Sequence, residues 1–280
     1  MKELRNEKGF FEGYKGRKLF YQYWIPDSGD FKANLIVLHG LGTHSHRIET
    51  PAEFFTEKGY GVFSFDLRGH WMNIKEIPGH IENIEDIEND ISLFKDFIIN
   101  ETGEKPFFLM GHSLGGLATL IYAINHSDIV GVLASSPLLG FSSDISLEKK
   151  VGSFLAKMNP TRVIEFEIDQ NKLTTDLKLL RKQIADKHKL TQITYSTYSE
   201  IDSAMKWVMK NTSNLNSPIF IIQAGNDKIT DKNQVKKFFQ RVNSKDKSYR
   251  EYDGFLHDLW HEKGRAQVFR DMFVWLEKHL

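Results

Sequence analysis

The sequence predicts an α/β protein with a mostly parallel central sheet flanked by helices. Short apolar runs typical of buried strands alternate with amphipathic helical patterns along most of the chain, and this alternation is the signature of that class. The 280 residues are 40% hydrophobic, which is enough to bury the large core that such a sheet requires. No internal repeat or low-complexity stretch interrupts the pattern.

A hairpin and a series of buried strands are expected. Phe10–Tyr14 and Lys18–Trp24 are predicted to pair as an antiparallel hairpin around Gly16. Leu35–Leu38 is a continuous apolar run, as in a strand that is buried on both faces. The other expected strands are Gly61–Phe65, Phe107–Met110, Val130–Ala134, Pro218–Gln223 and Tyr249–Tyr252.

Helices are expected between these strands. Pro51–Lys58 is followed by Gly59, a residue that favours a helix C-terminus. Ile81–Asn100 carries isoleucine and phenylalanine at three- and four-residue steps, the spacing of an amphipathic helix. The remaining expected helices are Leu114–Asn125, Lys232–Arg241 and Arg265–His279.

The alternation stops between residues 141 and 213. No buried strand is evident there, and helical patterns dominate at Leu147–Met158, Thr175–Lys187 and Ile193–Asn211. We therefore expect a helical cap, inserted after the sixth strand, over the carboxyl edge of the sheet, where open α/β sheets bind ligands. Residues 1–140 and 214–280 would form the core domain and residues 141–213 the cap.

Composition argues against several classes of protein. Lys+Arg and Asp+Glu both number 37, and this neutral balance argues against a nucleic-acid partner. The absence of cysteine excludes disulfides, thiolate zinc sites and a cysteine nucleophile. His44 and His46 lack an accompanying carboxylate cluster, so neither a metal nor another cofactor is expected. The sequence has no signal-peptide core and no apolar run that approaches the ~20 residues needed to span a bilayer, so a cytoplasmic protein is expected. Contact of the cap with a membrane surface is compatible with the sequence.

The segment Gly111-His112-Ser113-Leu114-Gly115 has the Gly-x-Ser-x-Gly pattern of a nucleophile elbow. An expected buried strand leads into it and an expected helix leads out. The chemistry needs this arrangement, because a turn this tight admits only glycine beside the serine and aims helix amides at the developing oxyanion. Ser113 is therefore the expected nucleophile. The alternative is a helix N-cap serine in a glycine-rich turn.

A serine nucleophile needs a histidine base that is oriented by a carboxylate. With an elbow of this type, the acid and then the histidine follow the serine in the chain. Asp227 lies just past the expected strand Pro218–Gln223 and is the predicted acid; helix capping, its alternative role, suits Asp231 better. His257 follows the last expected strand and is the predicted base, with His261 as its rival.

Two backbone N–H groups are expected to form an oxyanion hole. One belongs to Leu114, directly after the nucleophile. The other is expected from Leu41, in the loop after the strand Leu35–Leu38, where Gly40 lets the backbone approach the substrate. His112 is expected to pack beside the nucleophile rather than to act as the base.

These motifs resemble those of the monoacylglycerol lipase and lysophospholipase group of α/β-hydrolases. The resemblance covers nearly the whole chain and implies the α/β-hydrolase fold. The segments that carry it are the oxyanion loop His39–Arg47, the elbow Gly111–Gly116, the cap signatures Leu173–Asp176 and Ala185-Asp186, and the histidine loop Gly254–Glu262.

The chain departs from the group's pattern in two places. Trp71 follows Asp66–His70 where the group usually has glycine, and this change is expected to alter the loop backbone and the pocket entrance. Leu177 and Lys187 stand where the cap's Asp-Pro pairs usually have proline. Both departures concern substrate specificity and leave the three predicted catalytic residues in place.

The expected function is carboxylic ester hydrolysis through a Ser-His-Asp triad and an acyl-enzyme. The resemblance implies monoacylglycerols or lysophospholipids as substrates. Gly40, His112 and apolar residues of the cap, among them Ile145 and Phe154, are expected to line the substrate site. The main alternative is a short-chain or aryl carboxylesterase on the same machinery, and an acyltransferase is less favoured.

Overall fold

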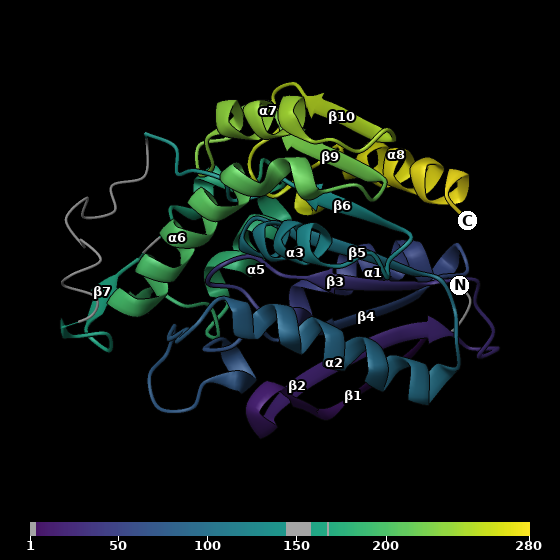
Figure 1. Cartoon of the computed structure of the whole chain (residues 1–280), viewed down its shortest axis with the longest axis horizontal. Helices are drawn as coiled ribbons and strands as arrows, with labels where there is room; N and C mark the ends of the chain where they lie inside the picture. The colour runs from purple at the N-terminus through teal and green to yellow at the C-terminus, as the bar shows by residue number, and fades with distance from the viewer. Residues whose placement is uncertain (1–3, 144–157, 167) are drawn as a thin grey trace.

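A mixed eight-stranded sheet forms the centre of the protein (Figure 1), whose computed structural model describes residues 4–143, 158–166 and 168–280. The strand order is β1-β2-β4-β3-β5-β6-β9-β10. Strands β1 and β2 form an antiparallel hairpin at one edge, β2 is antiparallel to β4, and all other neighbours are parallel. The strands are β1 (Leu4–Gly13), β2 (Arg17–Pro26), β3 (Asn34–Leu38), β4 (Gly61–Phe65), β5 (Phe107–His112), β6 (Gly131–Ser135), β9 (Ile219–Ala224) and β10 (Lys247–Tyr252).

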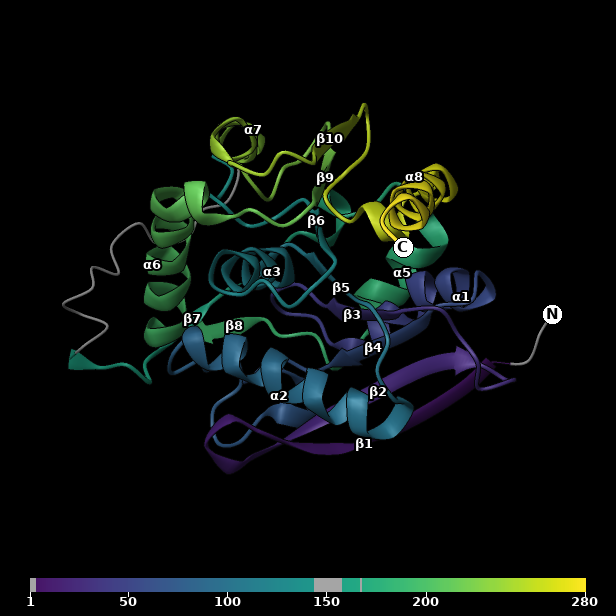
Figure 2. The ribbon, with the colours of Figure 1, turned by 45° about the vertical axis from the view of Figure 1, so that its right-hand side comes forward.

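Helices cover both faces of this sheet. Figure 2 shows α1 and α8 on one side and α2, α3 and α6 on the other. Each face has its own apolar core, and the central strands β3, β4, β5, β6 and β9 are buried along their whole length, as their continuous apolar runs predict. The helices are α1 (Glu49–Glu57), α2 (Glu85–Thr102), α3 (Leu114–Asn125), α5 (Leu177–Ala185), α6 (Tyr195–Asn211), α7 (Lys232–Arg241) and α8 (Arg265–Lys278).

Helix α2 begins later than the sequence predicts. The expected helix started at Ile81, but the structure starts it at Glu85. The amide of Ile81 donates to the Thr197 hydroxyl at 2.7 Å, and the amide of Ile84 donates to the Glu200 carboxylate at 3.0 Å, so that side chains of α6 hold the segment before the helix. At the helix start, the Asn83 side chain accepts from the amide of Glu85 at 2.8 Å.

The segment between β6 and β9 contains α5, α6 and a small antiparallel sheet of β7 (Val163–Glu165) and β8 (Gln192–Thr194). This small sheet is not predictable from the sequence, because three-residue strands, one of them mostly exposed, carry no apolar run. Helix α6 packs against α3, and its buried residues join the main core. Ile145, Phe154 and most of the helix expected at Leu147–Met158 lie outside the described residues.

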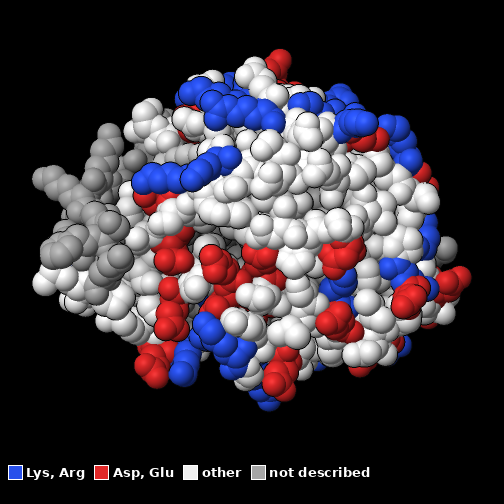
Figure 3. All heavy atoms as spheres, viewed as in Figure 1, with Lys and Arg blue, Asp and Glu red and all other residues white. Residues whose placement is uncertain are grey.

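Charge is distributed unevenly over the face drawn in Figure 3. Basic side chains gather over α7, whose sequence includes Lys232, Lys236 and Arg241, whereas acidic side chains gather over α2, which begins with Glu85 and Asp86.

Within the described ranges, none of the helices has the length and apolar character needed to cross a membrane.

Candidate active site

Ser113 sits on a strained turn between β5 and α3. Its φ is 56° and its ψ is −115°, a conformation that residues other than glycine rarely adopt. A Cβ on Gly111 would lie 2.1 Å from the carbonyl oxygen of Gly115, and a Cβ on Gly115 would lie 2.4 Å from that of Leu38. Both glycines are therefore required by direct backbone contact. The turn is held by a hydrogen bond from the Ser113 amide to the Ser135 carbonyl at 3.0 Å.

Asp227 and His257 meet at the carboxyl ends of β9 and β10. The Asp227 carboxylate lies 3.1 and 2.9 Å from Nδ1 of His257 through its two oxygens. Because the Asp227 carboxylate can only accept, Nδ1 carries the hydrogen in the neutral form of the ring, and Nε2 keeps its lone pair. Both residues are almost fully buried, and His257 and Ser113 line the same cavity.

The Asp227 carboxylate is held in its ionised form. It accepts from the amides of Ile229 and Thr230, both at 2.9 Å, and from the Thr230 hydroxyl at 2.8 Å. Burial alone would raise the pKa of Asp227, but the charge and hydrogen bond of His257, together with these amides, hold it well below its ordinary value. Asp231, not Asp227, caps α7, because its side chain accepts from the amide of Asn233.

The loop after β3, from His39 to Thr43, lies directly against Ser113. A Cβ on Gly40 would be 3.2 Å from the Cβ of Ser113. No described residue accepts a hydrogen bond from the amide of Leu41. Leu114 is the first residue of α3, and amides of a first helical turn have no partner within their helix. Two backbone donors are thus available beside the serine.

A cavity opens at Ser113, with a wall that comes partly from the segment between β6 and β9. That segment contributes Leu173, the first residue of one of the cap signatures, and three apolar side chains that no motif in the sequence indicated. The three are Phe166, Ile168 and Leu190. Gly40, Leu41 and His112, which the sequence analysis named, also line the cavity. No local pattern marks the new residues, because only the folded segment brings them to the serine.

His112 packs on the ring of His257, with centroids 4.6 Å apart. Burial, and then the neighbouring charge of His257, lower the pKa of His112 to about 4. Its Nδ1 has no hydrogen-bond partner among the described residues. His112 is therefore a neutral packing residue in the cavity wall.

His261, the rival base in the sequence, forms a pair of its own. Its Nδ1 lies 2.9 Å from the Asp258 carboxylate, which also accepts from the Gln183 amide at 3.1 Å. Burial opposes a low pKa for Asp258, but the charge of His261 holds it well below its ordinary value. His257 and His261 thus face different carboxylates, and both line the cavity.

Trp71 adopts a φ of 35°, a region that favours glycine. Its ring lies over His44 at 4.6 Å and over His188 at 5.3 Å, between centroids. Because it also contacts Phe20 at 5.4 Å, Trp71 links the hairpin to the loop after β3 and to the segment after α5.

Across the described part of the chain, no group of three or more acidic, histidine or cysteine side chains is placed to hold a metal.

Comparison with known proteins points to one family. The family model described as "Serine aminopeptidase, S33" matches residues 29–264. Phospholipase YtpA of Bacillus subtilis is 26% identical over 252 residues, 89% of this chain and 96% of that protein. The monoglyceride lipase of Saccharomyces cerevisiae is 27% identical over 292 residues, covering 96% and 93%.

Solved structures agree with this match. The monoacylglycerol lipase of Paleococcus ferrophilus superposes with a TM-score of 0.79 at 27% identity, over 99% of this chain and 100% of that one. A soluble variant of the yeast monoglyceride lipase, in complex with a substrate analog, gives a TM-score of 0.88 at 24% identity, covering 97% and 94%. The predicted fold, a mostly parallel sheet flanked by helices as in α/β-hydrolases, is confirmed.

Proposed function

The chain belongs to the serine aminopeptidase S33 family of α/β-hydrolases, and on this premise we propose that it hydrolyses lipid esters through Ser113, His257 and Asp227. The observation that carries the proposal is the buried Asp227–His257 pair, whose histidine lines the cavity that opens at the strained Ser113 turn. A serine hydroxyl is a weak nucleophile until a base accepts its proton. A histidine oriented by an ionised carboxylate is the base that such a serine requires.

In the proposed mechanism, Nε2 of His257 accepts the Ser113 proton as Oγ attacks the ester carbonyl carbon. The amides of Leu41 and Leu114 bind the oxyanion, and Asp227 stabilises the imidazolium. The C–O bond to the alcohol then breaks, and His257 returns the proton to the leaving oxygen. His257 next deprotonates a water molecule, which attacks the acyl carbon. The bond from that carbon to Ser113 Oγ then breaks, His257 returns the proton to Oγ, and the carboxylic acid leaves.

The apolar cavity wall favours an acyl chain as the bound group. Phe166, Ile168 and Leu173 present apolar surface to the space beside Ser113, and burial of a methylene there contributes roughly 0.8 kcal/mol. The relatives named phospholipase and monoglyceride lipase fit such a substrate. We therefore propose monoacylglycerols or lysophospholipids as the substrate class, with short-chain or aryl esters as the alternative.

The family's description names a peptidase, but the cavity favours an ester. An aminopeptidase must bind the free ammonium group of its substrate, which calls for an unpaired carboxylate. Asp258 is the one acid among the described residues that line the cavity, and it is already engaged by His261 and Gln183.

The proposal is tested by a chain-length series of glycerol and p-nitrophenyl esters, together with labelling by a fluorophosphonate. We expect activity on medium and long acyl chains, and stoichiometric labelling that Ser113→Ala abolishes. Ser28→Ala removes an exposed serine and should change neither readout. Activity that peaked at two carbons and vanished by ten would refute the lipid substrate, and full activity of Ser113→Ala would refute the mechanism.

A further inference from the structure

We propose that His39 and Thr43 are positioning residues that orient and polarise the Leu41 amide by binding the carbonyl oxygen of Gly40. The inference rests on the proposed function, since it concerns the oxyanion hole of the same reaction. It assigns a task to two polar side chains that do not touch the substrate in the mechanism above.

The Gly40 carbonyl oxygen accepts hydrogen bonds from three donors. The Thr43 hydroxyl donates at 2.9 Å, the Thr43 amide at 3.2 Å, and Nδ1 of His39 at 2.9 Å. This carbonyl and the Leu41 N–H belong to one planar trans peptide, in which they point in opposite directions. Donors that fix the direction of the oxygen therefore also fix the direction of the Leu41 N–H.

The same contacts strengthen the amide as a donor. Hydrogen bonds to a carbonyl oxygen polarise its peptide group, so that the N–H on the other side becomes a better donor. No described residue accepts from Leu41 N–H, and the loop lies against Ser113, where a Cβ on Gly40 would meet the serine Cβ at 3.2 Å. The Leu41 amide is thus preorganised before substrate arrives, which is how an oxyanion hole lowers the barrier.

The role of His39 as a donor follows from its other nitrogen. The amide of Leu67 donates to Nε2 of His39 at 2.9 Å, so Nε2 carries the lone pair and Nδ1 carries the hydrogen. Burial, and then the neighbouring His70, lower the pKa of His39 well below its ordinary value. The neutral tautomer that donates to Gly40 is therefore the one present at neutral pH.

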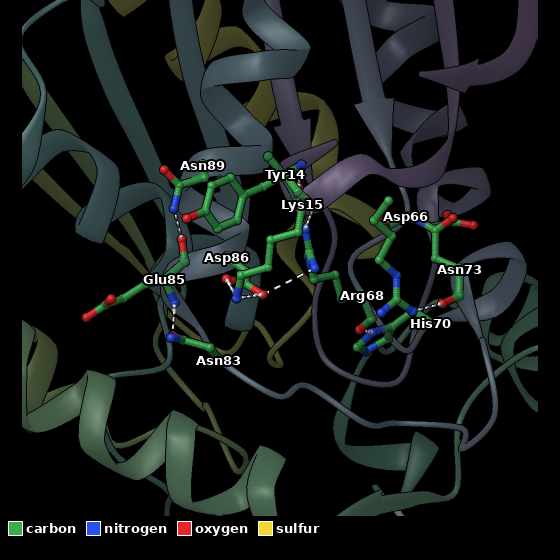
Figure 4. A network of polar contacts seen from close by, with 12 residues as sticks. Tyr14, Lys15, Asp66, Arg68, His70, Asn73, Asn83, Glu85, Asp86 and Asn89 are labelled. Carbon is green, nitrogen blue, oxygen red and sulfur yellow. Dashed lines mark hydrogen bonds and ion pairs between the residues drawn. The ribbon is translucent and has the colours of Figure 1, made fainter. Parts of the chain in front are cut away.

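His39, in the loop after β3, binds an amide of the loop after β4, and His70 makes the contact in the opposite direction. Its Nε2 accepts from the Gly42 amide at 3.2 Å, and its Nδ1 donates to the Arg68 carbonyl at 2.9 Å. Arg68 is itself fixed, because its side chain donates to Asp90 at 2.6 Å and to Asp86 at 3.2 Å (Figure 4). The loop after β4 is thus anchored to α2 and forms a rigid support for the oxyanion loop.

The test removes one donor without touching the backbone. Thr43→Val has nearly the same shape but lacks the hydroxyl, whereas Thr43→Ser keeps it. We expect Thr43→Val to lower kcat about threefold to tenfold at unchanged KM, with rates normalised to active sites titrated by a fluorophosphonate. The affinity for an alkylboronic acid, which forms a tetrahedral adduct with the serine, should fall by the same factor. Thr43→Ser should stay within about twofold of the wild type.

Thr56→Val is the matched control. The Thr56 hydroxyl also donates to a backbone carbonyl, that of Trp24 at 3.4 Å, but it lies in α1 and does not line the cavity. It should change thermal stability and leave kcat and boronate affinity unaltered.

Three results would overturn the inference: an unchanged kcat in Thr43→Val, a loss of kcat without a matching loss of boronate affinity, or an equal loss in Thr43→Ser. A wild-type protein that neither reacted with the fluorophosphonate nor hydrolysed esters would instead refute the proposed function, which is a distinguishable outcome.

Discussion

The elbow at the carboxyl end of β5 is held by its own backbone, whereas the described residues between β6 and β9, the outer segment, are attached to the loop after β3 largely by side chains. At the elbow, Gly111 and Gly115 allow backbone contacts that no side chain would permit. On the outer segment, the Asp186 carboxylate accepts a hydrogen bond from Nε2 of His44 at 3.0 Å and forms an ion pair with Arg47 at 3.2 Å.

The contacts of the outer segment with the loop after β10 combine both kinds of bond, since the Asp258 amide also donates to the Leu173 carbonyl at 2.9 Å. Glu262 accepts from the Thr175 amide at 2.7 Å, and Gln183 donates to Asp258 at 3.1 Å. One backbone bond, from the Leu190 amide to the Gly42 carbonyl at 2.9 Å, reaches the oxyanion loop. We therefore expect substitutions at the elbow to affect both the chemistry and the fold. Substitutions in the outer segment should affect mainly the binding of substrate.

The largest effect is expected from Gly111→Ala. Its new Cβ would lie 2.1 Å from the Gly115 carbonyl oxygen, a backbone atom that cannot move aside. We expect a loss of about 4 kcal/mol or more in the free energy of unfolding, together with loss of activity. Gly116→Ala is the graded control, because its Cβ would lie 3.0 Å from Pro137 Cα. Equal stability of the two variants by chemical denaturation would contradict this account of the elbow.

Asp227→Asn is expected to lower kcat about 10⁴-fold while the protein stays folded, because the amide no longer holds His257 in its productive tautomer. Steady-state kinetics and circular dichroism measure the two properties. Asp258→Asn alters the second pair, with His261, and should reduce kcat less than about tenfold, since that pair takes no part in the proposed proton transfers. A larger loss of kcat in Asp258→Asn than in Asp227→Asn would indicate that His261, not His257, is the base.

The pH dependence of stability should report the buried histidines around the elbow. The pKa values of His70 and His112 are lowered to about 4, and that of His39 lies well below its ordinary value, in each case mainly by burial. Between pH 6.5 and 4 the unfolded chain binds protons that the folded chain does not, so the free energy of unfolding falls as the pH falls. We expect a loss on the order of 1–2 kcal/mol per histidine by pH 5, measured by urea denaturation.

His112→Gln should remove about one proton from the slope of this dependence. A stability that stayed constant from pH 7 to pH 5 would show that these rings are not buried as neutral groups.

The smallest effect is expected from Asp186→Asn, which weakens the attachment of the outer segment to His44 and Arg47. Since neither partner belongs to the proposed catalytic residues, kcat should stay within about twofold and KM should rise severalfold, with a loss of about 1 kcal/mol in stability. Asp202→Asn alters an exposed pair with Lys206 and should change none of these quantities. A loss of kcat larger than the rise in KM would mean that the segment also controls the chemistry.

Much of this molecule is readable from short stretches of sequence. Apolar runs such as Leu35–Leu38 predict buried strands, because a strand covered on both faces needs apolar residues at every position. The elbow is equally local, since Gly111 and Gly115 flank the serine that they accommodate. Asp231 was predicted to cap the helix that it does cap, because a cap is a contact between neighbours in the chain.

Other features depend on residues far apart in the chain. Thr197 and Glu200 of α6 bind the segment before α2, and the cavity wall includes Phe166 and Leu190, contacts that no local pattern indicates. The exchange of hydrogen bonds between the loops of His39 and His70 exists only because β3 and β4 are neighbours in the sheet.

Short stretches of sequence were enough to predict the fold class and the tight serine turn, because both follow from periodicity or from contacts within a few residues. Only the packed chain shows that His261 pairs with Asp258, which apolar side chains line the cavity at Ser113, and how the peptide between Gly40 and Leu41 is oriented. These depend on the packing of distant loops at one edge of a sheet, where small differences in backbone position select one hydrogen-bond partner over another.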